Sequence, residues 1–267
     1  MHFDAMADEY AAGRPPYPPA LWDTITELGV MKAGRRALDL GAGTGQATGP
    51  LLAAGLHVTA VEPGERLAQR LHASYPAADV VVARAEDAEL AADSFDIAVA
   101  ATSIHWMDLG IVVPKLRRAL RPDGTLLVWR TVFGDPEGPV TPFRQRMMQI
   151  VAQRGPLVTP GTGPEDADAT ARQLTASGLF AVDRISTFRW SVELDEEGVR
   201  RLFATFSDWS ADEVSRAATA VHDLGGTVVE HYLSWLLVLK PADGARRGMR
   251  QRSSGRSRPS ITGKGSV

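Results

Sequence analysis

Apolar and polar positions alternate in blocks along residues 18–131 of this 267-residue chain. Short runs rich in Val, Ala, Leu and Ile, typical of strands buried on both faces, are separated by segments whose apolar residues recur at helical spacing. The pattern predicts strands at 37–40, 57–62, 79–84, 95–101 and 124–130, and helices near 18–30, 46–54, 64–75 and 110–120. Such alternation indicates an α/β fold with a doubly wound, mostly parallel sheet.

The pattern is weaker beyond Val132. Apolar spacing predicts helices near 141–154, 166–177, 195–206 and 211–223, and strands near 183–191 and 228–239. The Gly- and Pro-rich stretch 155–164 indicates a loop or lid rather than a domain linker.

Composition fits one α/β domain with additions, since 44% of the residues are hydrophobic and 23% are charged. The longest apolar run near the end, 233–239, is too short to span a bilayer, and the first residues do not resemble a signal peptide. We therefore expect a cytoplasmic protein without a membrane segment. Because cysteine is absent and the six histidines lack ligand spacing, we expect no metal site.

Charge is uneven along the chain. Residues 246–267 hold six arginines and Lys264 but no acid, so the remainder is acidic. An acidic body disfavours nucleic acid as a partner, because phosphate binding needs a clustered basic surface. The tail has almost no apolar residues, which predicts disorder, and its alternative role is attraction to nucleic acid or a membrane surface.

A glycine turn follows the first predicted strand, in the run Asp39-Leu40-Gly41-Ala42-Gly43-Thr44-Gly45. Glycines allow a tight turn and close approach of a ligand to the backbone. A dinucleotide fingerprint places its third glycine three residues after the second, whereas Gly45 comes two after Gly43. Asp39 would repel pyrophosphate but can accept a hydrogen bond from an amine or hydroxyl. A cationic nucleoside without phosphate is therefore favoured.

This run resembles the first motif of class I S-adenosylmethionine-dependent methyltransferases. Two further segments agree with the resemblance: Glu62 and Pro63 end the second strand, where a carboxylate suits ribose hydroxyls, and Ala85-Glu86-Asp87 is similar to the segment that frames adenine. Arg84 departs from the acid or small polar residue of many relatives. The resemblance implies a seven-stranded Rossmann-like sheet, an antiparallel edge hairpin, and S-adenosylmethionine as cofactor.

After the fourth strand, Thr102-Ser103-Ile104-His105-Trp106 resembles the type 11 methyltransferase-domain family, in the branch that includes trans-aconitate methyltransferase. The opening segment, with Tyr10, Arg14 and Tyr17, is similar too. The resemblance implies His105 as a group that orients or deprotonates the acceptor, with packing against Trp106 as the alternative. The implied cofactor contacts are Asp39, Gly41, Ala42, Gly43, Gly45, Glu62, Pro63, Ala85, Glu86, Asp87, Thr102, Ser103, Tyr10 and Arg14, and the implied substrate contacts are Tyr17, His105 and Trp106.

The resulting hypothesis is one methyltransferase domain over residues 1–245 and a basic disordered tail over 246–267. The domain comprises a core near 17–131, a helical substrate cover near 132–227 and a terminal strand near 228–239. The expected reaction is transfer of the sulfonium methyl to an O, N or carboxylate group of a small molecule. Its alternatives are a nucleic-acid methyltransferase, a non-catalytic binder of the cofactor and a nicotinamide-dependent oxidoreductase. The acceptor and the oligomeric state stay open.

Overall fold

The computed structural model describes residues 4, 13–154, 166–206 and 208–242. Its seven strands form one sheet in the order β3-β2-β1-β4-β5-β7-β6, in which β7 runs antiparallel to both of its neighbours and the other pairs are parallel. The doubly wound, mostly parallel sheet is therefore confirmed. The antiparallel pair at its edge is found as well, but two helices, 196–204 and 211–223, join its strands in place of a hairpin turn. The strands are β1 (Arg36–Leu40), β2 (His57–Val61), β3 (Asp79–Val81), β4 (Phe95–Ala101), β5 (Leu120–Phe133), β6 (Phe180–Asp195) and β7 (Thr227–Pro241).

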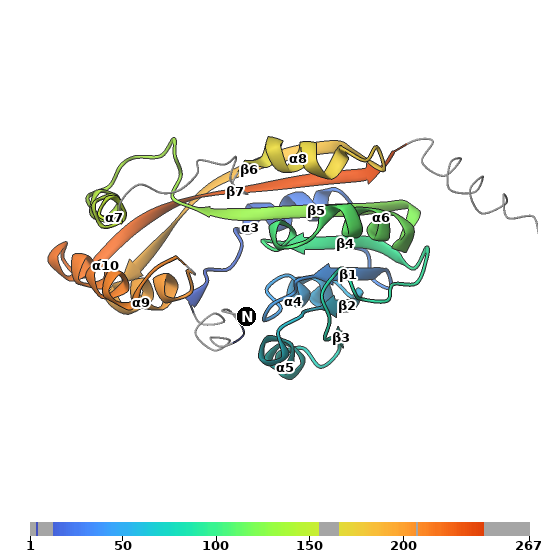
Figure 1. The fold of residues 1–267 in the computed structure, drawn as a ribbon, viewed down its shortest axis with the longest axis horizontal. Coiled ribbons are helices and arrows are strands. Elements are labelled where there is room, and N and C mark those ends of the chain that lie inside the picture. The colour runs from blue at the N-terminus through green and yellow to red at the C-terminus, as the bar shows by residue number, and fades with distance from the viewer. Residues whose placement is uncertain (1–3, 5–12, 155–165, 207, 243–267) are drawn as a thin grey trace, which may run out of the picture.

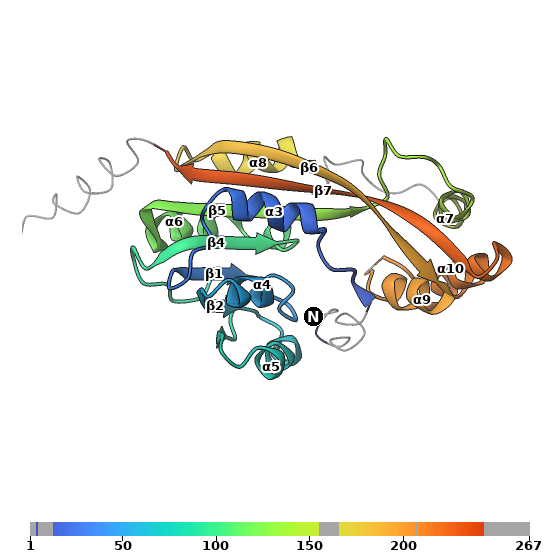
Figure 2. The ribbon, with the colours of Figure 1, turned by 180° about the vertical axis from the view of Figure 1, so that it is seen from behind.

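Helices cover both faces of the sheet (Figures 1 and 2). Those of the first half agree with the predicted positions to within a few residues, and a short 3-10 turn, Ile104–Trp106, follows β4. The described helices are α3 (Pro19–Glu27), α4 (Thr48–Ala53), α5 (Glu65–Ser74), α6 (Leu109–Ala119), α7 (Pro142–Ala152), α8 (Ala167–Thr175), α9 (Glu196–Ala204) and α10 (Ala211–Asp223).

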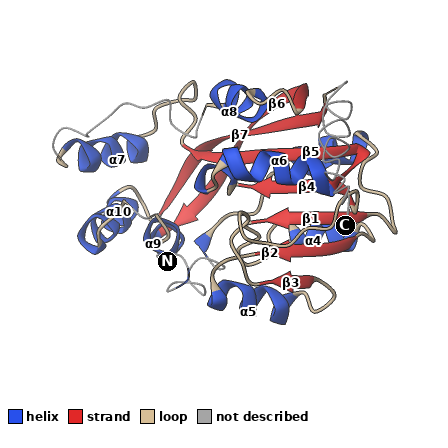
Figure 3. Cartoon of the chain, turned by 45° about the vertical axis from the view of Figure 1, so that its right-hand side comes forward, coloured by secondary structure: helices blue, strands red, loops and turns tan. Residues whose placement is uncertain are grey.

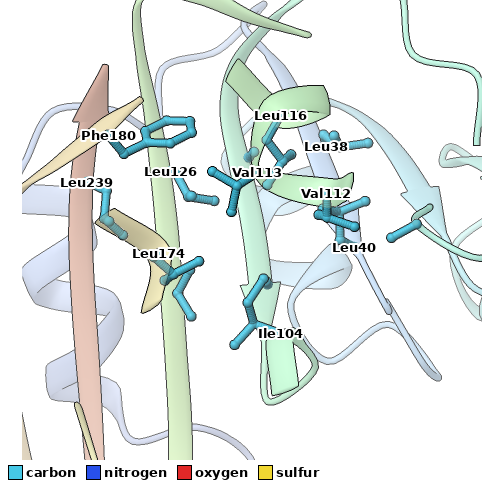
Figure 4. Close-up of a cluster of buried hydrophobic side chains, with 14 of the residues drawn as sticks. Leu38, Leu40, Ile104, Val112, Val113, Leu116, Leu126, Leu174, Phe180 and Leu239 are labelled. Carbon is cyan, nitrogen blue, oxygen red and sulfur yellow. The ribbon is translucent and has the colours of Figure 1, made fainter. Parts of the chain in front are cut away.

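The core lies in two layers, because successive side chains of a strand point to opposite faces. Leu126 and Val128 of β5 pack with α6 and α8, whereas Leu127 and Trp129 pack with α3 and α4. Figure 4 shows the first layer, where Leu116 and other side chains of α6 meet those of the central strands. The strands are thus buried on both faces, as their near-continuous apolar runs predict.

Three strands are longer than the sequence pattern predicts. The register of β4 with β5 steps from Phe95–Leu120 to Ile97–Thr125, so residues 121–124 bulge out of a strand that begins before the predicted start at 124. The strands β6 and β7 pair almost from end to end, from Phe180–Pro241 to Asp195–Thr227. Pairing with a neighbouring strand keeps residues in the strand conformation even where the local sequence does not favour it, so these strands extend beyond their predicted ends.

The helices α7, α9 and α10 gather at one end of the molecule, where β6 and β7 extend to meet them (Figure 3). Phe143 of α7, Phe203 of α9 and Val221 of α10 share a separate apolar cluster with Tyr232 of β7. We call this group of helices the cover. The stretch 155–164 and the basic tail 246–267 lie outside the described residues.

Candidate functional site

The glycine loop joins β1 to α4 at the carboxyl end of the parallel strands. Gly41, Gly43 and Gly45 have φ values of 63°, 58° and 94°, a backbone region that favours glycine. A Cβ added at Gly41 would lie 2.6 Å from Ser103 Cβ, and Gly41 N–H donates to Val61 O over 2.8 Å. The loop is therefore held between the ends of β2 and β4, so closely that a side chain at Gly41 would not fit.

Glu62 lies beside this loop, at the end of β2. Its side chain is buried, and its two carboxylate oxygens accept hydrogen bonds from Gly43 N and Gly64 N, each over 2.8 Å. Burial raises the pKa of Glu62, and these two N–H donors act in the opposite direction. The predicted proximity of Glu62 to the loop is found. A carboxylate oxygen can accept a further hydrogen bond, so ribose hydroxyls can share it with the backbone.

Asp39 is fully buried beneath the same loop. Its Oδ2 accepts a hydrogen bond from Thr48 Oγ1 over 2.7 Å, while Oδ1 has no hydrogen-bond partner among the described residues. Burial, together with the negative charge of Glu62, raises the pKa of Asp39 from 3.8 to about 7. A buried carboxylate with a free oxygen favours a cationic or hydrogen-bond-donating ligand at this place.

The end of β4 connects the loop to the N-terminal segment. Tyr17 Oη and Thr102 Oγ1 are 3.1 Å apart and form a hydrogen bond, and Ser103 Oγ donates to Leu40 O over 2.6 Å. Thr102 has a φ of 55°, which is strained for a β-branched residue and typical of functional sites. Ser103 thus contacts the strand that leads into the loop, and Tyr17 is bound to Thr102 beside it, whereas Tyr10 lies outside the described residues. The cofactor contacts of Thr102 and Ser103 and the substrate contact of Tyr17 stay predictions.

His105 is paired with an arginine of the next strand. Arg130 Nη1 lies 2.8 Å from His105 Nδ1, and because a guanidinium can only donate, Nδ1 is the acceptor and the neutral ring carries its proton on Nε2. Burial and then the charge of Arg130 lower the pKa of His105 to about 4. Trp106 lies against the ring, with centroids 4.8 Å apart. His105 is therefore uncharged at neutral pH, and its basic nitrogen is engaged.

The segment that contains Ala85, Glu86 and Asp87 is fastened to α6. Lys115 Nζ donates to the carbonyl oxygens of Ala85, Glu86 and Ala88, and Asp108 N donates to Glu86 Oε1 over 2.8 Å. Sequence reasoning missed Lys115, because nothing in a lone lysine on a predicted helix indicates which loop it will reach. Its ammonium group fixes the loop that the resemblance assigns to adenine.

A small, partly open pocket, with about 40 Å³ of space for the centres of water-sized molecules, begins beside the glycine loop and extends toward the cover. The N-terminal segment, the loop, β4, β5, α9 and β7 all contribute to it. Its lining residues are Arg14, Pro15, Tyr17, Gln46, Thr102, Thr131, Phe133, Leu202, Phe206 and Tyr232. His105 and Trp106 are not among them. Sequence reasoning missed Thr131, Phe133 and Tyr232, whose shared position depends on the register of β5 with β7.

Comparison with known proteins agrees with this geometry. Residues 38–128, which span β1 to β5, match the family model of a methyltransferase domain. The match identifies this part of the chain as a methyltransferase domain. An uncharacterised methyltransferase of Mycobacterium tuberculosis is 39% identical over 132 residues, which are 49% of this chain and 53% of the relative. The chain thus spans about half the length of such curated relatives.

Two solved structures share the fold of this chain. A candidate type II methyltransferase from Anaeromyxobacter dehalogenans has a TM-score of 0.59 at 25% identity, over 85% of this chain and 97% of its own. A phosphoethanolamine N-methyltransferase from Haemonchus contortus, solved with phosphomonomethylethanolamine and S-adenosylhomocysteine, has a TM-score of 0.53 at 17% identity, over 89% of this chain and 57% of its own. The fold is therefore one that methyltransferases use.

The loop residues fit S-adenosylmethionine, the cofactor of this family. The free, buried Oδ1 of Asp39 suits a group that donates hydrogen bonds, and the cofactor carries an ammonium. Within the described residues no helix combines the length and apolar character needed to cross a bilayer, and His, Asp and Glu do not gather in threes that could hold a metal ion.

Proposed function

We propose that this protein transfers the methyl group of S-adenosylmethionine to a small-molecule acceptor bound in the pocket between Arg14 and Tyr232. One observation carries the proposal: Tyr17, Gln46 and Thr102 line the pocket at its loop end, so acceptor and cofactor would meet there. When bound, the cofactor supplies a sulfonium methyl that needs no further activation. The protein's contribution is then to hold the two reactants in line and to exclude water.

The chemistry of the lining restricts the acceptor. Arg14, Tyr17, Gln46, Thr102, Thr131 and Tyr232 all carry hydrogen-bond donors, and none of the lining residues that the structure describes is an Asp, Glu, His or Lys. No lining side chain can therefore take a proton at neutral pH. An acceptor that is a nucleophile on arrival, such as a carboxylate, an acidic phenol or an unprotonated amine, suits this site.

Arg14 carries the positive charge of the pocket. Its Nη2 donates to Thr205 O over 3.2 Å, and its guanidinium carbon lies 4.7 Å from the centroid of the Phe206 ring. These contacts place the cation over an aromatic wall, which favours an anionic oxygen nearby and an apolar body along the rings. Within this proposal His105 orients the loop after β4, or donates from Nε2, and does not act as the base.

Calorimetric titration with S-adenosylmethionine, S-adenosylhomocysteine and NAD in parallel tests the cofactor. We expect micromolar binding of the first two and none of NAD, with binding weakened in Glu62→Ala and retained in Glu27→Ala, a matched change at an exposed carboxylate of α3. Turnover of S-adenosylmethionine to S-adenosylhomocysteine with small carboxylates, phenols and amines then tests methyl transfer. Binding of NAD alone would contradict the proposal, and cofactor binding without turnover on any acceptor would favour a non-catalytic binder.

A further inference from the structure

Tyr232 of β7 holds its ring in a fixed position at the cover end of the pocket. The ring is stacked on Trp190 with centroids 4.8 Å apart and planes at 23°, and it meets the edge of Phe133 at 5.5 Å. Trp190 is itself fixed, because its Nε1 donates to Ser234 Oγ over 3.0 Å. With both neighbours in place, the direction of the Tyr232 hydroxyl is set before any ligand arrives.

Tyr232 is one of the residues that line the pocket, and its hydroxyl is buried there without a hydrogen-bond partner among the described residues. Only 3% of the residue is exposed. Burial raises the pKa of Tyr232, and the charge of Glu230 raises it further. The group therefore stays protonated and remains a donor. A buried polar group without a partner lowers the stability of the fold, so its presence calls for an explanation such as a ligand.

Among the described residues, three charged groups act electrostatically on Tyr232. The buried carboxylate of Glu230 has the largest effect, and Arg14 and Arg144, the ion-pair partner of Glu230, act in the opposite direction. Together the three groups carry one net positive charge, which an anionic ligand would balance. The register of the strands also gives the distance between Tyr232 and the loop end of the pocket. Trp129 pairs with Ala101 at the end of β4, and Phe133, four residues further on, pairs with Tyr232. Tyr232 is thus about 13 Å along the strands from the end of β4.

We propose that Tyr232 is a specificity-determining residue, whose hydroxyl donates a hydrogen bond to a carboxylate or other anionic oxygen that the acceptor carries remote from the atom to be methylated. The inference rests on the proposed function, because it assigns the far end of the same pocket. It defines the acceptor as a small anionic molecule with an apolar or aromatic body that separates two polar ends.

Binding of phenylacetate, benzoate and hexanoate to the protein saturated with S-adenosylhomocysteine tests this assignment. Ligand-observed NMR titration measures each affinity in the unchanged protein, in Tyr232→Phe and in Tyr75→Phe, which removes the same hydroxyl outside the pocket. We expect the tightest of the three carboxylates to bind at least 10-fold more weakly to Tyr232→Phe and equally well to Tyr75→Phe. Benzylamine, with a similar ring but a positive charge, should not bind to any of them.

Equal affinity of Tyr232→Phe and the unchanged protein, tighter binding of benzylamine than of phenylacetate, or no binding of any carboxylate would each overturn the assignment. Failure to bind S-adenosylhomocysteine would instead contradict the proposed function, so the two failures are distinct. Thermal unfolding gives a second readout. The melting temperature of Tyr232→Phe should equal or exceed that of the unchanged protein, and a lower one would show that the hydroxyl has a partner inside the protein.

Discussion

The glycine loop is built largely from backbone, whereas the pocket is built from side chains that six separate segments contribute. In the loop, the N–H groups of Gly41 and Gly43 and the carboxylate of Glu62 all lie between residues 41 and 62 of the chain. In the pocket, Tyr17 and Tyr232 line the same space only because strands far apart in the sequence pair in the sheet. A substitution in the loop therefore acts on backbone geometry, while a substitution in the pocket changes one side chain of the lining.

The largest expected effect is at Gly43. Gly43→Arg places a long side chain at a position with a positive φ, beside Glu62, and should abolish measurable binding of S-adenosylhomocysteine in calorimetry. His105→Ala is the control, because His105 lies outside both the glycine loop and the pocket lining and its loss should leave that affinity unchanged. A His105→Ala protein that no longer binds S-adenosylhomocysteine would show that the cofactor site extends to the loop after β4.

Asp39 should make the stability of the protein depend on pH. Its carboxyl group keeps its proton up to a pH of about 7 in the folded state but loses it near 3.8 when unfolded. The folded state therefore binds more protons between these values, so the free energy of unfolding should fall as the pH rises from 4 to 7, by up to about 4 kcal/mol. Urea unfolding across this range measures the slope. In Asp39→Asn the slope should be shallower, and an unchanged slope would contradict the assignment.

Glu62→Ala should weaken binding of S-adenosylhomocysteine by roughly 10- to 100-fold, because it removes charge-assisted hydrogen bonds worth about 1.5–3 kcal/mol. The variant also leaves Gly43 N and Gly64 N without their acceptor, so the loop loses its geometry. Calorimetry beside Glu27→Ala measures the effect. An affinity equal to that of the control would mean that the loop holds the cofactor without this carboxylate.

Arg130→Met should move the pKa of His105 from about 4 part of the way toward 6.5, because the burial of the ring is retained while the neighbouring charge is lost. Nitrogen-15 NMR of labelled histidine follows both the titration and the tautomer. In the unchanged protein the proton should lie on Nε2 throughout the neutral range. A neutral ring with its proton on Nδ1 would contradict the hydrogen bond that Arg130 donates to His105 Nδ1.

The smallest expected effect is at Ser210, which caps α10 of the cover. Ser210 and Glu213 form a reciprocal capping box, so Ser210→Ala should lower the free energy of unfolding by about 1 kcal/mol. Chemical unfolding measures this loss. The affinity for S-adenosylhomocysteine should not change, because Ser210 lies in the cover and not in the glycine loop. A loss of affinity in the same variant would contradict the separation of the two regions.

The contrast between the glycine loop and the pocket explains which parts of the site the sequence could predict. A turn that requires positive φ at Gly41, Gly43 and Gly45 can be read from glycine spacing alone, and the strand pattern predicts that Glu62 ends beside it. The environment of His105 could not be predicted, because Arg130 comes from another strand. The hydroxyl of Tyr232 could not be assigned either, since its place depends on a register that strand-like composition does not encode.

The strand β7 passes without interruption from the cover into the sheet, where it lies between β5 and β6, from Thr227 to Pro241. Its first residues pack with α10, and its later residues pair with β5. Because β7 also pairs with β6 almost from end to end, a rotation of the cover about this strand would have to break backbone pairs of the sheet. The cover is thus joined to the sheet by its own backbone and not only by packed side chains.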